Sequence, residues 1–258
     1  VGAGFLGMNH APFVVNSNGQ VRNLDVKPDQ RFFQRAYALD VIENGFINQK
    51  RGSIASDHRD VLRQAFSLMT SEQMEAFKVA GEPEAVKDRY GDNNFGKSCL
   101  MARRLVEVGV PFIEVNLGGW DNHQNIFPTL RDNKLPMLDK GMSALVEDLE
   151  QRGLLEDTAI IWMGEFSRTP RINQNAGRDH WARSWSVAVG GAGMNGGIAI
   201  GETNSDGTRV ETEPHSSQDI MASVCKALGI SLTTTFTSKS GRPMKIANSG
   251  KVITDLFS

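Results

Sequence analysis

Hydrophobic residues recur every three or four positions through the first half of the chain, after a Gly- and Asn-rich start that predicts an extended loop. This spacing is typical of amphipathic helices, and glycines mark several of their expected ends. Helices are predicted around residues 28–45, 61–68, 74–77 and 99–106. Residues 1–109 are therefore expected to form a loop followed by a mostly helical segment.

The second half of the chain alternates short apolar runs with helical patterns. The runs predict strands at 110–117, 158–163 and 185–189, and helical spacing predicts helices at 135–149 and 220–228. Ser216 or Ser217 is the expected cap of the last helix. Strands and helices joined by short connections favour a parallel sheet covered by helices. Residues 110–258 thus predict an α/β core, within a single domain over 1–258.

Composition narrows the classes of function. The chain has 28 Lys and Arg against 30 Asp and Glu, and a net charge of -2 gives no basic field for a nucleic acid. No stretch approaches the roughly 20 apolar residues of a membrane span. The two cysteines, Cys99 and Cys225, are too few for a disulfide framework or a thiolate zinc site. Because residue 1 is Val and no signal peptide follows, we expect the chain to be the C-terminal portion of a longer protein.

One segment matches the phosphate-loop pattern of nucleotide-binding proteins. Residues 91–98 read Gly-Asp-Asn-Asn-Phe-Gly-Lys-Ser, and a predicted helix follows them. A phosphate loop also needs a buried strand before it, so that backbone N–H groups point at the phosphates. The preceding residues 84–90 are too charged for such a strand. A turn leading into a helix is the favoured interpretation, and nucleotide binding through Gly91 to Ser98 stays open as an alternative.

Three polar clusters lie at the ends of predicted strands, where α/β enzymes place their sites. They span residues 118–123, 164–170 and 177–181. Carboxylates and neutral imidazoles are ligands for zinc or manganese, and arginines can bind an anionic group through paired hydrogen bonds. The candidate metal ligands are Asp121, His123, Glu165, Asp179 and His180, and the candidate anion-binding residues are Arg168 and Arg178.

Each cluster also has a purely structural interpretation. Asp and His are common in surface loops, and Asp179 could cap a helix or pair with Arg178. The hypothesis of a metal and anion-binding site rests on the occurrence of three such clusters at the ends of successive predicted strands. A cation beside arginine side chains would suit phosphoryl or sulfuryl oxygens.

Several motifs resemble a bacterial family known as domain of unknown function 1501, often labelled sulfatase-like. They occur in order at residues 89–91, 99–107, 118–123, 164–170, 177–181 and 241–243. That family is similar to the alkaline phosphatase and sulfatase superfamily. The resemblance implies an N-terminally truncated, alkaline phosphatase-like three-layer fold with a mainly parallel sheet. It also implies an extracytoplasmic or periplasmic location, because family members often carry export signals.

The resemblance assigns roles to individual residues. Asp121 and His123 would bind one metal, His180 with Asp179 would take a later ligand position, and Glu165 would stand where the superfamily usually has an Asp-His pair. The superfamily's first metal-binding Asp and its nucleophile would lie upstream of this chain. The expected function is metal-dependent hydrolysis of a small anionic ester of phosphate or sulfate. Zinc or manganese is the favoured metal over calcium or magnesium, and a non-catalytic binding module is the second alternative.

Overall fold

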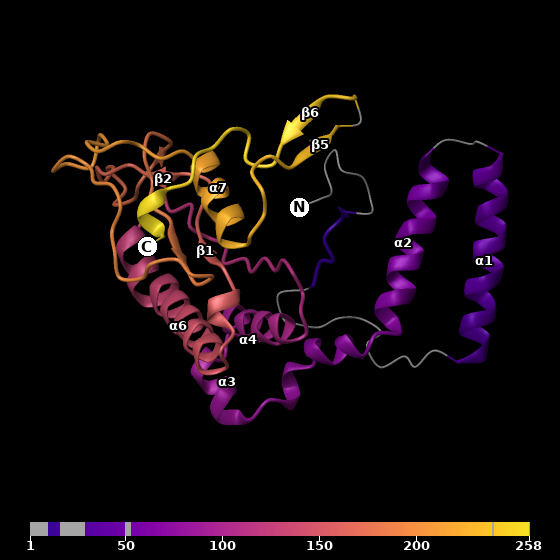
Figure 1. Ribbon diagram of the computed structural model, residues 1–258. Helices are drawn as coiled ribbons and strands as arrows, with labels where there is room; N and C mark the ends of the chain where they lie inside the picture. Colours follow the sequence, from indigo (N-terminus) through magenta and orange to yellow (C-terminus); the bar gives the residue numbers. More distant parts are fainter. Residues whose placement is uncertain (1–9, 16–28, 50–52, 239, 258) are drawn as a thin grey trace.

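The computed structural model describes residues 10–15, 29–49, 53–238 and 240–257 (Figure 1). Most of the loop predicted for the first 25 or so residues lies outside these ranges. The described part divides into a long helical hairpin and a larger lobe (Figure 1). The larger lobe contains the candidate site.

The hairpin consists of α1 (Gln30–Asn48) and α2 (Ser53–Met69), which pack side by side. α1 begins where the Asp29 carboxylate accepts a hydrogen bond of 2.7 Å from the backbone N–H of Phe32. The two helices are joined by ion pairs, including one of 2.7 Å between Arg63 and Asp40. Both helices confirm the prediction from helical spacing.

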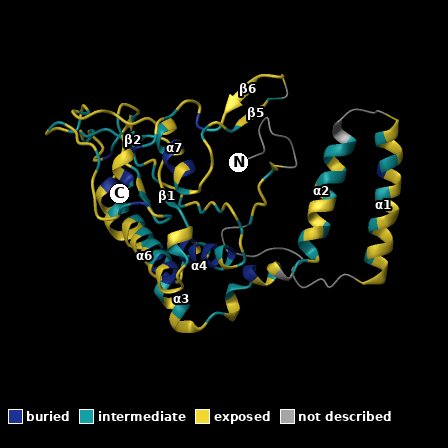
Figure 2. Ribbon diagram, viewed as in Figure 1, coloured by how far each residue is buried: buried dark blue, intermediate teal, exposed yellow. Residues whose placement is uncertain are grey.

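The core of the larger lobe is formed by packed helices. These are η3 (Glu72–Phe77), η4 (Val79–Gly81), α3 (Glu84–Tyr90), α4 (Asn94–Glu107) and α6 (Leu135–Gln151). One apolar cluster joins α3, α4 and α6 around Tyr90, Leu100 and Ala144, and a second joins η3 to α4 around Phe77 and Met101. The buried positions of α4 and α6 stand out in dark blue (Figure 2).

A buried guanidinium also binds these helices together. The side chain of Arg103 is 2% exposed and pairs with Glu82 at 2.9 Å, Glu107 at 2.8 Å and Asp148 at 3.0 Å. The Tyr90 hydroxyl donates to Asp148 at 3.0 Å. Burial and the neighbouring Asp148 charge raise the pKa of Tyr90, so its hydroxyl keeps its proton as the donor.

The strands correct the predicted architecture. Within the described residues they form three antiparallel pairs. These are β1 (Ile160–Trp162) with β4 (Ala188–Gly190), β2 (Ser167–Arg168) with β3 (His180–Trp181), and β5 (Thr235–Thr237) with β6 (Pro243–Lys245). The predicted three-layer, alkaline phosphatase-like fold with a mainly parallel sheet is therefore wrong.

The physical reason lies in how the apolar runs are covered. β1 and β4 pair directly with each other, and Trp162 and Met163 stay 41% and 51% exposed. The run 110–117 is extended but is assigned to no strand; Ile113, Val115 and Leu117 pack on the helical clusters while Phe112 is 81% exposed. This apolar run therefore packs one of its faces against helices. It is not a strand of a sheet that is buried on both faces.

Short elements connect and follow these parts. They are α5 (Ile126–Thr129), the π-helical turn η5 (Leu130–Lys134), η6 (Leu155–Asp157), α7 (Ser217–Ala227) and η7 (Thr254–Leu256). Ser216 caps α7 by accepting from the N–H of Asp219, whose carboxylate in turn accepts from the N–H of Ser216. Among the described helices, none combines the length and apolar character that crossing a membrane requires.

Candidate metal centre

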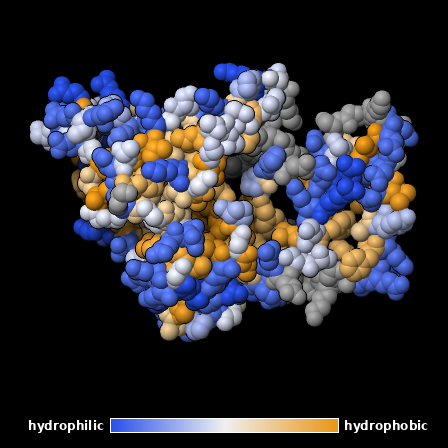
Figure 3. All heavy atoms as spheres, viewed as in Figure 1, coloured by the Kyte–Doolittle hydropathy of each residue, from blue (hydrophilic) through white to orange (hydrophobic). Residues whose placement is uncertain are grey.

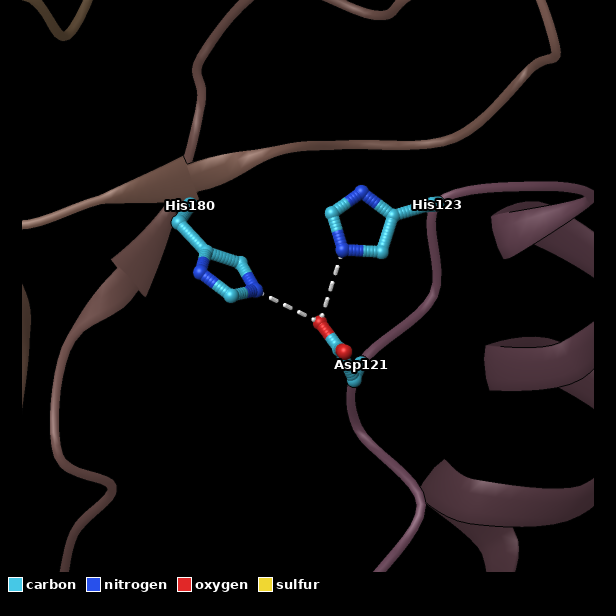
Figure 4. A group of neighbouring side chains, drawn as sticks. All are labelled: Asp121, His123 and His180. Atoms are coloured by element: carbon cyan, nitrogen blue, oxygen red, sulfur yellow. Dashed lines mark hydrogen bonds and ion pairs between the residues drawn. The ribbon is translucent and has the colours of Figure 1, made fainter.

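Two distant segments bring three ligand-type side chains together (Figure 4). Asp121 and His123 lie in the loop after the extended run, and His180 begins β3. Asp121 Oδ1 lies 3.0 Å from His123 Nε2 and 2.9 Å from His180 Nε2. All three ligand atoms lie within 4.8 Å of one another.

These separations suit a small divalent cation. Zinc bonds imidazole nitrogen and carboxylate oxygen at roughly 2.0–2.2 Å, so tetrahedral ligand atoms lie about 3.4 Å apart. In such a site the Asp121 oxygen would lie a few tenths of an ångström farther from each ring nitrogen than the observed 3.0 and 2.9 Å. Two imidazoles and one carboxylate leave a coordination position for a water or substrate oxygen, as catalytic zinc sites do.

A close backbone approach holds the two loops together. A Cβ added at Gly177 would lie 2.0 Å from the carbonyl carbon of His123, so only glycine allows this contact. Next to it, the N–H of Arg178 donates to the carbonyl of Asn122 at 3.0 Å. The position of His123 relative to His180 is thus set by main-chain packing between the loops.

Asp179 fixes the orientation of the His123 ring. Its Oδ1 lies 2.8 Å from His123 Nδ1, the nitrogen that faces away from Asp121. Asn173 Nδ2 donates to the same carboxylate oxygen and to the His123 carbonyl, both at 3.1 Å. A carboxylate on the far nitrogen of a ligating histidine fixes its tautomer and increases its basicity. Asn173 was missed in the sequence because an amide in a polar loop carries no distinctive signal.

Residues of the β2–β3 pair and next to it also border the three ligand groups. Arg168 is the cross-strand partner of His180, and its guanidinium pairs with Asp121 Oδ1. The ring of Phe166 lies 4.7 Å from the His180 ring, and the Arg168 guanidinium lies 5.5 Å above the Phe166 ring. Arg168 thus places a positive charge directly beside the three ligand groups.

The charges of the centre reinforce one another. Hydrogen bonds from His180 and Arg168 hold the pKa of Asp121 below its usual value, so Asp121 is an anion at neutral pH. The hydrogen bond to Asp179 raises the pKa of His123. A proton on His123 competes with a metal, so acidification is expected to weaken metal binding.

Two predicted site residues lie apart from this group. Glu165 is exposed in the turn between β1 and β2 and is not one of the three converging residues. Arg178 is half-buried, and its Nη1 donates to the backbone carbonyls of Thr169 and Pro170. Arg178 therefore stabilises the loop after β2, whereas Arg168 contacts Asp121 in the centre.

The phosphate-loop alternative lacks its structural context. The helix α3, and not a strand, leads into Gly91. Asn93 caps α4 by accepting from the N–H of Gly96 at 2.9 Å, and Lys97 Nζ pairs with Asp92 at 2.6 Å. The N–H of Gly96 and the lysine ammonium are thus used within the turn.

Comparison with known proteins identifies a family and no closer relative. No curated protein and no solved structure matches the chain. Residues 1–257 match the family described as "Protein of unknown function (DUF1501)". Because this match covers nearly the whole sequence, the chain belongs to the DUF1501 family.

Proposed function

We propose that Asp121, His123 and His180 bind one divalent transition metal, and that the centre hydrolyses a phosphate or sulfate ester. The observation that carries the proposal is the convergence of three ligand atoms within 4.8 Å, from a loop and a strand far apart in the sequence. The second nitrogen of His123 is already held by Asp179. Histidines that bind a metal usually donate their second ring nitrogen to such a carboxylate.

The ligand chemistry favours zinc or manganese over calcium or magnesium. Imidazole nitrogens suit zinc and other transition metals, whereas calcium and magnesium prefer an all-oxygen environment. When bound, such a metal polarises an ester oxygen and activates a water or other nucleophile. The protein's own contribution is orientation of the substrate and neutralisation of its charge.

Arg168 is the residue best placed for that contribution. Its guanidinium already contacts the Asp121 carboxylate, so an oxyanion bound at the centre would lie within its reach. With Asp121 engaged as a metal ligand, Arg168 would be available to pair with an anionic group of the substrate. Arg178 supports the loop that carries this arrangement, through its bonds to the carbonyls of Thr169 and Pro170.

Calorimetric titration with zinc and manganese tests the binding step. We expect one metal per chain for the native protein, and loss of that binding in Asp121→Ala and His180→Ala. His215→Ala is the matched control, because His215 is an exposed histidine outside the group. Absence of binding to the native protein, or equal binding by all variants, would contradict the proposal.

Turnover of aryl phosphates and aryl sulfates by the metal-loaded protein tests the hydrolytic step. We expect activity that disappears with Asp121→Ala and falls with Arg168→Ala while metal binding remains in the latter. Stoichiometric metal without turnover across the panel would refute hydrolysis and indicate a binding module instead.

A further inference from the structure

A cavity of about 780 Å³ lies beside the candidate centre, between the β2–β3 pair, the segment after β4 and the start of α7. Much of its lining is apolar, including Trp181, Trp185, Val187, Ile198, Ile220 and Ile253. Hydrophobic residues also gather on the surface of this lobe near α7 (Figure 3). The volume lies within the roughly 300–1,000 Å³ range of pockets that bind small molecules.

Arg168 belongs to both the cavity and the centre. It lines the cavity, and its guanidinium pairs with Asp121. In the β2–β3 pair, Arg168 faces His180 across the strands, and Ser167 faces Trp181. Neighbouring residues on a strand point to opposite sides, so the histidine ligand and the tryptophan wall lie on opposite faces of one short ladder. Arg168 therefore links the two spaces, because it lines the cavity and pairs with Asp121.

We propose that this cavity binds the organic part of the ester substrate, and that this part is an uncharged aromatic group. The inference rests on the proposed function, because it places the phosphoryl or sulfuryl group at Arg168 and the metal ligands. A planar ring gains most from burial against two indole side chains and branched aliphatic residues. A small polar alcohol would leave these walls exposed to water.

The charged residues of the cavity favour a neutral ring. Arg168 and Arg183 line it, but so do the carboxylates of Glu202 and Glu213. The Arg183 guanidinium lies 5.3 Å above the Trp181 ring and thus covers one of its faces. A second anionic group on the substrate would meet the two carboxylates, so we infer a single anionic group, at the Arg168 end.

The test compares phenylphosphonate with methylphosphonate. Both are stable anions, and they differ only in whether phosphorus carries a phenyl or a methyl group. Calorimetry on the zinc-loaded and zinc-free protein gives the affinity of each. We expect phenylphosphonate to bind roughly tenfold to hundredfold more tightly, because the ring leaves water. Equal affinities, or no binding of either compound to the zinc-loaded protein, would overturn the inference.

A cavity-filling variant locates the effect. Ala199 lines the cavity from a loop, and Ala199→Trp should remove the preference for the phenyl compound while zinc and methylphosphonate still bind. Ala38→Trp, at an exposed position of α1 far from the cavity, is the matched control and should keep the preference. A preference that survives Ala199→Trp would contradict the cavity as its source.

Two further results separate this inference from the proposed function. If Ala199→Trp does not fold, as judged by circular dichroism, Trp185→Ala replaces it, and its loss of an aromatic wall should reduce the phenyl preference about tenfold. If zinc does not bind but the phenyl preference persists in zinc-free protein, the metal proposal fails and the cavity assignment stands. If zinc binds and the preference is absent, only the cavity assignment fails.

Discussion

Two aspartates of the centre differ in what they contact. Asp121 shares one oxygen with His123 and His180, whereas Asp179 contacts His123 at the nitrogen that faces away from Asp121. A carboxylate that hydrogen-bonds a ligating histidine orients the ring and raises its basicity without bonding the metal itself. Its removal typically lowers metal affinity by 10- to 100-fold. The two residues should therefore respond differently to the same substitution.

We predict that Asp179→Ala weakens zinc binding about tenfold to hundredfold, whereas Asp121→Ala abolishes it. Asp179→Asn keeps an acceptor for His123 and should fall between the native protein and Asp179→Ala. Competition with a chelator of known affinity measures these differences. Asp132→Ala, which removes an exposed partner of Arg131, should leave the affinity unchanged. Complete loss in Asp179→Ala would instead make Asp179 a direct ligand.

At this scale the sequence identifies residue types but not their neighbours. The motif around Asp121 and His123, and the one around Asp179 and His180, could be selected from ligand chemistry alone. Which nitrogen of His123 faces which carboxylate depends on the approach of Gly177 to the His123 backbone. That contact joins residues that are distant in the chain, so no local sequence pattern predicts it.

Among the elements, α7 begins at a cap that the sequence predicted. Ser216, one of the two expected caps, accepts from the N–H of Asp219. Asp219 also accepts from the N–H of Lys251 at 2.7 Å, and this bond ties the chain's last segment to the helix. The bonds from Lys251 and Ser216 lower the pKa of Asp219 to about 2.

We predict that Asp219→Asn destabilises the protein by about 1 kcal/mol at pH 7, a modest value because this exposed position is screened by solvent. The folded-state pKa lies below the unfolded value, so the carboxylate stabilises the fold above about pH 4. That contribution is lost as the pH falls through about 2. Urea unfolding at pH 7 and pH 3 measures the effect, and the gap between variant and native protein should narrow at pH 3. A gap independent of pH would contradict it.

The longer helices were predictable from periodicity, because a helix satisfies its backbone hydrogen bonds locally. Strands were not predictable in the same way. The apolar run at 158–163 contains β1 and the run at 185–189 overlaps β4, but these strands pair antiparallel with each other. Direction and partner depend on the path of the chain between strands, which a short apolar run does not contain.

For the whole molecule, stability depends on the helical layer of the larger lobe. Arg103 of α4 pairs with Glu82, which follows η4, and with Asp148 of α6. The side chains of Glu82 and Asp148 are 8% and 5% exposed. Removing one member of a buried ion pair leaves an uncompensated charge away from water. The rest of the lobe, including the candidate centre, packs around this layer.

We predict that Arg103→Met lowers the free energy of unfolding by about 3 kcal/mol, because Glu82 and Asp148 each lose one of their two arginine partners and keep only Arg104 and Arg152. Chemical denaturation followed by circular dichroism measures the loss. Arg131→Met, at an exposed arginine paired with the neighbouring Asp132, should leave the stability nearly unchanged. Equal effects of the two substitutions would mean that the buried network contributes little.

The central claim is that two histidines and one aspartate share a metal. X-ray absorption at the zinc edge of the zinc-loaded protein tests it most directly. The account predicts about two imidazole nitrogens, with their ring scattering, and oxygen ligands at roughly 2.0–2.2 Å. It also predicts that His180→Ala removes one imidazole from the spectrum of any zinc that remains. A spectrum of oxygen ligands alone, or an unchanged imidazole count in that variant, would contradict the account.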